Sequence, residues 1–547
     1  MYQNVKTLTF IFVCAVAVAS LLLFSPVLSA QSSDPKMDKS LDWHGWLHEE
    51  PPETAEEIAE YKKMRLAQHY EKHGNPQPED AIRIDSIREL STYAEKDNVH
   101  VKMEPGTYRI TTDNAPDLSG WVQGPHGHKR AMLLHFSGDN SYWDLRDVTI
   151  ETETRVMGQF DAARGTGPYA HLPEGIHTMD EVYLTGKDSI LRGMDYENVH
   201  NDEWSVEEST AESMRVFNIE GERNLIHNVS ITSRTSWPYG YSSWLGKGGP
   251  SYARIRKKGC IAGGGYKNLH VGMEAHARSY GHALGFRSIR NLEFIDCVID
   301  GEIRNTNEIY EEKSGRAYEL LKENDFKKAG QDFRLPRNTM ISCQEGCFRT
   351  YGNNAVLKIL GCRISGTRSG TGLAGTGNHT RIYIAGSGFR HFEHKGITPA
   401  PNTTIRTCAA GFRYSPAVMI GRYGHTSIKN VDAEVTLLPS ETPDSVKQQM
   451  YSYQELPNAN PWPFVAASIS GKGHRVVLKQ DAEDLGKPNA PIVVGFQKFA
   501  EEPARDITLI NYTDQPVILR ESAKNCIVKS KAPVEDRGKN NEVSRLE

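Results

Sequence analysis

The sequence predicts an all-β solenoid, in which short strands repeat at a regular spacing. Six strand-like segments share a central apolar residue, and these anchors are Leu269, Leu292, Leu357, Ile382, Ile405 and Ile428. Successive anchors lie 23, 65, 25, 23 and 23 residues apart. A fixed period of about 20 to 50 residues is the signature of stacked structural repeats.

A second ladder of small residues supports the same register. Five residues after an anchor the chain carries Cys297, Cys362, Ser387, Ala410 and Ala433. Successive coils of a solenoid stack equivalent side chains on one another, so we expect Cys297 and Cys362 to be structural core residues. Seven of the eight cysteines lie beyond the N-terminal apolar run, and an odd number does not suggest a disulfide framework.

The single long step between anchors contains residues 305–333, whose sequence is rich in helix-forming residues. We expect a helical insertion there, which would emerge between two coils. Long insertions in a compact repeat are often functional.

The two ends of the chain differ in composition from its middle. Residues 1–30 combine a weakly basic start, an apolar run and a small-residue ending, which predicts a cleaved signal peptide and a secreted or periplasmic protein. An uncleaved anchor is the alternative. Residues 31–78 predict a helical extension, residues 79–530 the solenoid, and residues 531–547 a polar C-terminal tail.

The start of the solenoid carries a recognisable pattern. An amphipathic helix with Ile84, Ile87, Leu90 and Tyr93 is followed by "VHVKMEPGTYRI", which reads as a strand, a Pro-Gly turn and a second strand. Over residues 80–530 the chain resembles the pectin-lyase-like superfamily in its capping helix and coil period. The resemblance implies a right-handed, single-stranded parallel β-helix, and it is specific for fold rather than for reaction.

The strand before each anchor can be aligned by counting back from the anchor. Nine residues before the anchor, the mostly apolar positions are predicted to face the core: Ala283, Phe348, Leu373, Gly396 and Met419. Neighbouring positions should face outward because strand residues alternate between faces. This alignment predicts a polar patch of Tyr280, His282, Glu345, Arg349, Glu393 and Lys395, with the outward residues spanning about 15 Å.

Further residues extend this patch. Lys257 lies one coil earlier, Gly370 and Gly372 leave a trough without side chains, and Arg278, Arg368 and His391 flank the patch. Its polarity is local, because the equivalent positions farther along the chain are Pro416, Val418 and Ile420. A solvated outer face with ordinary cross-strand ion pairs is the alternative interpretation.

Basic residues and tyrosine with few carboxylates favour an anionic polymer as substrate. We expect a polysaccharide lyase that acts on a uronic acid chain, with His282 or Lys395 as base, Tyr280 as proton donor and Arg349 holding the carboxylate. The expected binding residues are Lys257, Arg278, Glu345, Arg368, His391, Glu393, Trp244 and Tyr241. Some uronate-cleaving enzymes of the resembled fold use calcium, so calcium is possible here too. The sequence shows no acidic calcium loop, and we therefore predict no calcium-binding residue.

Two other function classes fit the same sequence. An inverting glycoside hydrolase needs two carboxylates about 6.5–9.5 Å apart, for which Glu345, Glu393, Asp296, Asp300 and Glu302 are candidates. A non-catalytic, carbohydrate-binding β-helix of the adhesin kind is the third interpretation.

The net charge of −5 does not favour a nucleic acid partner. We expect a monomer that has no metal centre and no membrane contact after signal cleavage.

Overall fold

The computed structural model describes residues 52–123, 129–156, 159, 167–174, 176–201, 214–234, 282–286, 292–301, 303–305, 326–328, 331–333, 340–342, 346–350, 356–366, 371–372, 381–392, 396–411, 416–421, 428–439, 465–483, 485, 490–497, 500–501 and 503–547. The predicted signal peptide therefore lies outside the described residues. Among those residues, no helix combines the length and the apolar character that a bilayer span requires.

Helix α2 precedes the first strand, as the sequence predicts, but Ile84, expected in the second helix, lies in strand β1 (Ile82–Ile84) instead. Helix α2 (Ala55–Lys72) begins at Thr54, whose side chain accepts from the Glu57 amide while the Glu57 carboxylate accepts from the Thr54 amide. Such a reciprocal cap satisfies amides that would otherwise lack partners. A shorter helix, α3 (Ile87–Ala94), buries Ile87, Leu90 and Ala94 against the first coil. Other helical segments among the described residues include α4 (Ala115–Leu118), η3 (Pro78–Asp80) and η5 (Gly167–Tyr169).

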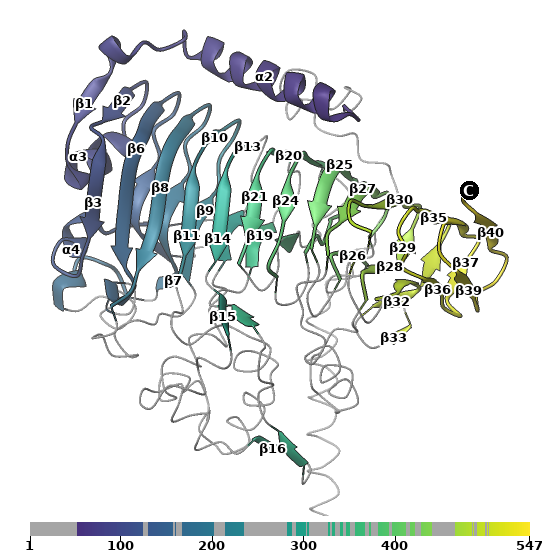
Figure 1. Cartoon of the computed structure of the whole chain (residues 1–547). Helices are drawn as coiled ribbons and strands as arrows, with labels where there is room; N and C mark the ends of the chain where they lie inside the picture. The colour runs from purple at the N-terminus through teal and green to yellow at the C-terminus, as the bar shows by residue number, and fades with distance from the viewer. Residues whose placement is uncertain are drawn as a thin grey trace, which may run out of the picture. The chain divides into compact units, whose positions relative to one another are not determined.

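Nineteen of the described strands form one sheet, called sheet A below (Figure 1). Its strands are β1 (Ile82–Ile84), β2 (His100–Met103), β3 (Gly106–Ile110), β6 (Tyr142–Glu153), β8 (Ile190–Val199), β10 (Leu225–His227), β11 (Ser230–Ser233), β13 (Leu292–Ile295), β14 (Val298–Gly301), β20 (Val356–Leu360), β21 (Arg363–Ser365), β23 (Arg381–Ala385), β24 (Gly388–Phe389), β25 (Thr403–Ala410), β27 (Asp432–Leu437), β30 (Arg475–Gln480), β35 (Thr508–Asn511), β38 (Ile527–Ser530) and β40 (Glu542–Arg545). The strands pair in parallel with the equivalent strand of the next coil, for example β13 with β20 and β20 with β23. This confirms the predicted parallel β-helix.

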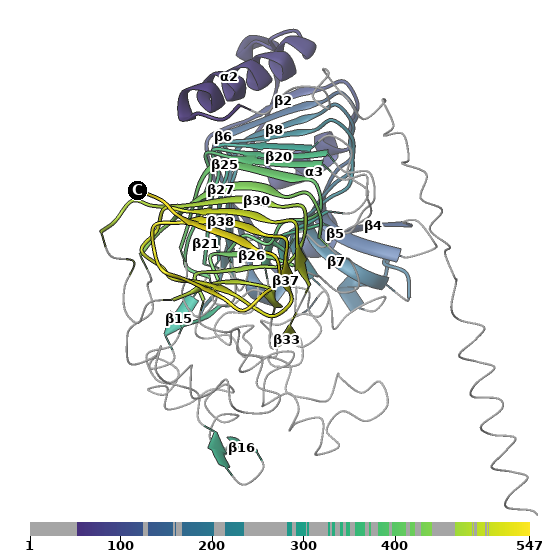
Figure 2. The same ribbon diagram turned by 90° about the vertical axis from the view of Figure 1, so that its right-hand side faces the viewer.

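A second, seven-stranded sheet lies on another side of the stack, called sheet B below (Figure 2). It contains β4 (Gly120–Gln123), β5 (Lys129–Phe136), β7 (Ile176–Leu184), β9 (Met214–Ile219), β12 (His282–Phe286), β19 (Gly346–Thr350) and β22 (Thr371–Gly372). The later coils use a five-stranded sheet of β26 (Val418–Ile420), β28 (Ala467–Ile469), β31 (Ile492–Val494), β36 (Val517–Leu519) and β39 (Val534–Asp536), and a three-stranded sheet of β29 (Gly471–Lys472), β34 (Ala504–Arg505) and β37 (Ala523–Lys524).

Sheet A bends sharply once in each coil at a residue with a left-handed backbone. Counting from the paired strands, these residues are level with one another: Asn228, Asp296, Gly361, Gly386 and Thr407. Glycine, asparagine and aspartate tolerate this conformation, whereas the β-branched Thr407 does not. A Cβ at Gly361 would lie 2.6 Å from the Asp296 carboxylate, so a larger residue would displace that side chain.

The predicted ladder of small residues follows this bend directly through Cys297, Cys362 and Ser387, but its next member is Cys408 and not the predicted Ala410, which pairs with Phe389. Cys297, Cys362, Ser387 and Cys408 are level in successive coils, and each is buried. Each side chain donates to the carbonyl two residues earlier, across the bend; the Cys362 thiol, for example, lies 3.6 Å from the Leu360 oxygen. The structural role that the sequence predicts for Cys297 and Cys362 is confirmed.

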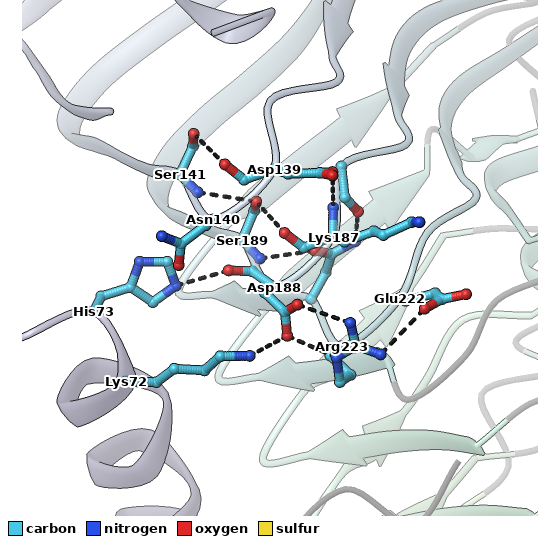
Figure 3. Close-up of polar contacts among 12 residues, drawn as sticks. Lys72, His73, Asp139, Asn140, Ser141, Lys187, Asp188, Ser189, Glu222 and Arg223 are labelled. Carbon is cyan, nitrogen blue, oxygen red and sulfur yellow. Dashed lines mark hydrogen bonds and ion pairs between the residues drawn. The ribbon is translucent and has the colours of Figure 1, made fainter. Parts of the chain in front are cut away.

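Helix α2 lies along the outer side of sheet A and crosses several successive coils (Figure 1). Along its length, Tyr61 contacts Tyr383 of β23 and Lys358 of β20, Arg65 pairs with Glu293 of β13, and Tyr70 contacts His227 of β10 and Arg192 of β8. One helical turn rises about 5.4 Å and one coil about 4.8 Å, so each turn meets roughly one coil. At its C-terminal end, Lys72 pairs with the Asp188 carboxylate and His73 contacts the Asp188 carbonyl (Figure 3).

Three predictions from the sequence need correction. The segment 305–333 is not helical where it is described, because β15 (Ile303–Asn305) pairs with β18 (Met340–Ser342), and β16 (Phe326–Lys328) forms an antiparallel hairpin with β17 (Gln331–Phe333). Residues 306–325 lie outside the described part. The solenoid also continues past residue 530, since β39 and β40 form a last layer on β36 and β38.

The third correction concerns the strand register after Ile382. Ile382 pairs with Thr403, and Ile405 pairs with Ile384 and Ala433. The equal spacing of 23 residues therefore does not align Ile382, Ile405 and Ile428. The irregular pairing of β25 with β27 lies between Ile405 and Cys408, next to the bend at Thr407.

Candidate functional site

Sheet B contains the strand segments on which the sequence places its polar patch. Its inner positions are identified by the core residues Leu134, Val182 and Phe217, which are level with one another on β5, β7 and β9. Phe136, Leu184 and Ile219 form a second inner row two positions later. Residues between these rows therefore belong to the outer face of sheet B.

A polar cluster occupies that outer face, and its members are Arg130, Asp180, Tyr183, Asn218 and Glu220 (the outer cluster). Arg130 contacts Glu220 at 2.7 Å and Asp180 at 3.4 Å, and its guanidinium lies 4.6 Å from the centre of the Tyr183 ring. The Tyr183 hydroxyl donates to Glu220 at 3.0 Å, and the Asn218 amide donates to Asp180 at 3.1 Å. Five side chains from three coils thus form one connected hydrogen-bonded and ionic network.

The protonation states in the outer cluster follow from its burial and charges. Burial disfavours the charged form of Arg130, but Asp180 and Glu220 outweigh this effect and raise its pKa. Burial raises the pKa of Tyr183 far above its usual value, although Arg130 opposes the shift. His135, stacked on Tyr183 at 5.2 Å, has its pKa lowered to about 4 by burial. At neutral pH the cluster therefore offers a protonated phenol and a permanent cation.

The register extends this face to two residues that the sequence predicts as catalytic. Asn218 is level with Gly285 of β12, and Gly285 is level with Arg349 of β19. His282 is level with Arg215 of β9 and with Gly346 of β19. His282 and Arg349 therefore lie on adjacent strands of sheet B, at positions continuous with the outer cluster.

The register differs in detail from the predicted one. Counting from the anchors aligns Arg349 with Leu284 and Phe348 with Ala283, but Arg349 pairs with Gly285 and Phe348 with Leu284. Leu284 is also level with the core residue Phe217, so it occupies an inner position rather than the predicted outer one. Gly372, predicted to be level with His282, pairs with Arg349.

The cause of this shift is visible on the described strands. Glu181 and Val182 are consecutive, yet both are directed into the coil: Val182 is a core residue and Glu181 accepts from Tyr196 and Asn198. Leu133–Leu134 and Val216–Phe217 are likewise consecutive core residues at the same level. Strict alternation is therefore broken once in sheet B, and a count of residues from the anchors cannot detect this.

Most other predicted site residues lie outside the described part of the chain: Tyr280, Lys395, Lys257, Arg278, Glu345, Arg368, Glu393, Trp244 and Tyr241. His391 is described and exposed, with a left-handed backbone in the turn after β24 of sheet A. Their proposed roles remain predictions.

The coil period gives no indication of the outer cluster, because the residues of this cluster precede the first anchor, Leu269. A usable signal was present in "IHTMDEVYL" and "MRVFNIE", which place Asp180, Tyr183, Asn218 and Glu220 among apolar residues in strand-like segments. Within the described ranges, no three His, Cys, Asp or Glu side chains come together in a way that could hold a metal ion.

Comparison with known proteins identifies no family for this chain. No family model and no curated protein matches the chain. Among solved structures, the surface adhesin PfbA of Streptococcus pneumoniae aligns with a TM-score of 0.31 at 9% identity, over 84% of this chain and 86% of the adhesin. The DFA-IIIase of Arthrobacter chlorophenolicus A6, solved without its lid, aligns with a TM-score of 0.28 at 10% identity, over 84% of this chain and 92% of the enzyme. Similarity at this level carries no argument about what this chain binds or converts.

Proposed function

We propose that this chain is a polysaccharide lyase that cleaves a uronic-acid-containing anionic polysaccharide by β-elimination, with its active site on the outer face of sheet B. The observation that supports it best is the pairing of β12 with β19, which brings His282 and Arg349 to adjacent strands beside the outer cluster. These residues are 67 positions apart in the sequence, and their strands are neighbours in sheet B.

The proposed chemistry needs three groups and no water. The Arg349 guanidinium pairs with the uronate carboxylate and stabilises the negative charge that develops when C5 loses its proton. His282 or Lys395 accepts that proton, the C4–O bond breaks, and Tyr280 gives a proton to the departing oxygen. One chain then ends in a C4=C5 double bond and the other carries a new hydroxyl, so atoms and protons balance.

A glycoside hydrolase is the second candidate, and the outer cluster is the observation that favours it. Asp180 and Glu220 provide two carboxylates on one face, as hydrolysis requires. Both contact Arg130, however, and a guanidinium stabilises the charged form of its partners. Since hydrolysis needs one protonated carboxyl group, the geometry around Arg130 makes this candidate the weaker one.

Incubation of the mature protein with galacturonate, alginate, hyaluronan and chondroitin polymers, with and without chelator, tests the proposal. We expect the ultraviolet absorbance of unsaturated uronates to appear with at least one polymer, and to fall by about 100-fold or more in Arg349→Gln. Arg363→Gln, an exposed arginine of β21, is the matched control and should keep full activity. Saturated reducing ends would establish the hydrolase instead, and binding without any product would establish the adhesin-like class.

A further inference from the structure

A cavity of about 330 Å³ opens in the last layer of the solenoid, where β39 and β40 lie (Figure 1). We propose that this cavity is a binding site for a small organic carboxylate, which Lys531 and Arg545 hold by its charge. The cavity is formed by the turn between β38 and β39 and by β40, whereas the proposed active site belongs to sheet B. Binding in this cavity therefore does not depend on the proposed function.

The lining of the cavity combines two cations with an apolar wall. Lys531 and Arg545 are its charged side chains, and Pro533, Val534 and Val543 contribute apolar surface. Within the described part of the chain, no acidic side chain lines the cavity. The lining therefore carries a net positive charge next to an apolar surface, which suits a ligand with one anionic group and a compact body.

The two cations are available to a ligand. Among the residues that the structure describes, neither Lys531 nor Arg545 forms an ion pair, and both side chains are exposed. The nearby Arg537 shows the contrasting situation, because it contacts the Glu535 carboxylate at 2.6 Å. Two cations that line one cavity repel each other, and a bound anion replaces this repulsion with attraction.

Arg545 occupies a position that is uncharged in the preceding coils. The residues level with it in the three preceding coils are Ser530, Asn511 and Leu478, and all three are buried. A charged side chain buried there without a partner would be costly. In the last layer the same inner position borders the open cavity, so Arg545 keeps its contact with solvent and with anything that the cavity holds.

Hydrogen bonds hold the turn that carries Lys531. The Ser530 hydroxyl accepts from the Asn511 side-chain amide at 3.0 Å and donates to the Ala532 carbonyl at 2.8 Å. The Lys531 backbone amide donates to the Asn511 carbonyl at 2.9 Å. The backbone on both sides of Lys531 is therefore fixed without a ligand, which lowers the cost of ordering the site when a ligand binds.

The lining favours a carboxylate over other anions. A carboxylate has two oxygens, which match two cationic side chains. A phosphate has further charged oxygens, and these would face Val534 or Val543 without a donor. The volume lies at the lower end of the range of about 300–1,000 Å³ for ligand pockets, so the cavity suits one small molecule or one sugar unit. A sugar acid and a short aliphatic acid share this chemistry.

Isothermal titration calorimetry of the protein with galacturonate, butyrate, galactose and inorganic phosphate tests the proposal. We expect a carboxylate to bind, and galactose and phosphate to bind at least about tenfold more weakly. Arg545→Gln and Lys531→Gln should each weaken carboxylate binding by about tenfold. Lys529→Gln, an exposed lysine of β38 outside the lining, is the matched control and should leave the affinity unchanged.

Arg349→Gln separates this cavity from the proposed active site. It should leave carboxylate binding unchanged, and binding that it removes while Arg545→Gln retains it would lie on sheet B and overturn the inference. Both cavity residues are exposed, so their substitution should not affect folding.

The remaining outcomes concern the ligand. Binding of galacturonate alone supports a sugar-acid site, and binding of butyrate supports a general carboxylate site. Preferred binding of phosphate, equal losses in Lys529→Gln and Arg545→Gln, or no binding of either acid overturns the inference. None of these results depends on unsaturated product, so the lyase proposal stands or fails separately.

Discussion

Arg65 of α2 and Glu293 of β13 form a buried ion pair, although 228 positions separate them in the sequence. Both side chains are at most 2% exposed, and the guanidinium contacts both carboxylate oxygens. Lys358 of the next coil lies 3.3 Å from the same carboxylate, and His69 of α2 lies 3.4 Å from it. Although burial disfavours the carboxylate form of Glu293, Lys358 and Arg65 hold its pKa well below the usual value.

This arrangement makes Glu293 a buried attachment point of α2 on sheet A. In Glu293→Gln, Arg65 and Lys358 keep their charges in a buried position without a counter-charge, so we expect a loss of about 3–5 kcal/mol in the free energy of unfolding. Chemical denaturation measures this loss. Glu60→Gln, in the exposed pair with Lys63, should change stability by less than about 1 kcal/mol. Equal effects of the two variants would contradict the assignment.

The sequence was sufficient to predict that α2 forms, but not where it packs. Its helix formers and acidic start are local signals, whereas its contacts with Glu293, Asp188 and Tyr383 depend on which side of sheet A is left uncovered. The coil period predicted the β-helix because stacked coils impose a repeat on the sequence. The insertion and the end of the solenoid were predicted wrongly because both segments have polar compositions that also suit helices or tails.

The ladder at the bend predicts which cysteine changes are tolerated. Cys362 and Ser387 are level, and each donates to the carbonyl two residues earlier and to a carbonyl of the preceding coil. Because Ser387 already occupies this environment, Cys362→Ser should lose less than about 1 kcal/mol of stability by chemical denaturation. Cys362→Ala removes the donor and should lose more. Burial raises the pKa of Cys362, so iodoacetamide should label it only after unfolding.

Thr407 provides a test of backbone strain. Its φ of 51° is left-handed, and the level residues of the preceding coils are Gly386 and Gly361. Asparagine adopts this conformation more readily than a β-branched residue, so Thr407→Asn should raise the unfolding free energy by about 1 kcal/mol. Thr404→Asn on the same strand should instead lower it, because threonine favours an extended strand. Denaturation curves of the two variants should therefore show changes of opposite sign in the unfolding free energy relative to the wild type.

Part of the candidate site could be predicted from the sequence, and the reason is physical. Residue types and a local strand pattern pointed to His282 and Arg349, and the fold brings their strands together. The alignment failed by one residue because consecutive residues such as Glu181 and Val182 both face inward. The outer cluster depends on side chains of three coils whose spacing is irregular, and no single-sequence period reveals such a contact.

The break in alternation also creates a titratable group inside the coil. Glu181 is buried, and burial raises its pKa from 4.5 to about 7, although bonds from Tyr196 and Asn198 oppose the shift. The folded protein therefore binds a proton that the unfolded chain releases between pH 4.5 and 7. The stabilisation that this bound proton gives the folded state is fully present below pH 4.5. It is lost as the pH rises through 7, which lowers the free energy of unfolding by roughly 3 kcal/mol. Unfolding free energies measured from pH 5 to 8 should no longer show this decline in Glu181→Gln. The exposed control variant Glu174→Gln should retain the decline. A wild-type pH profile in Glu181→Gln would contradict the assignment.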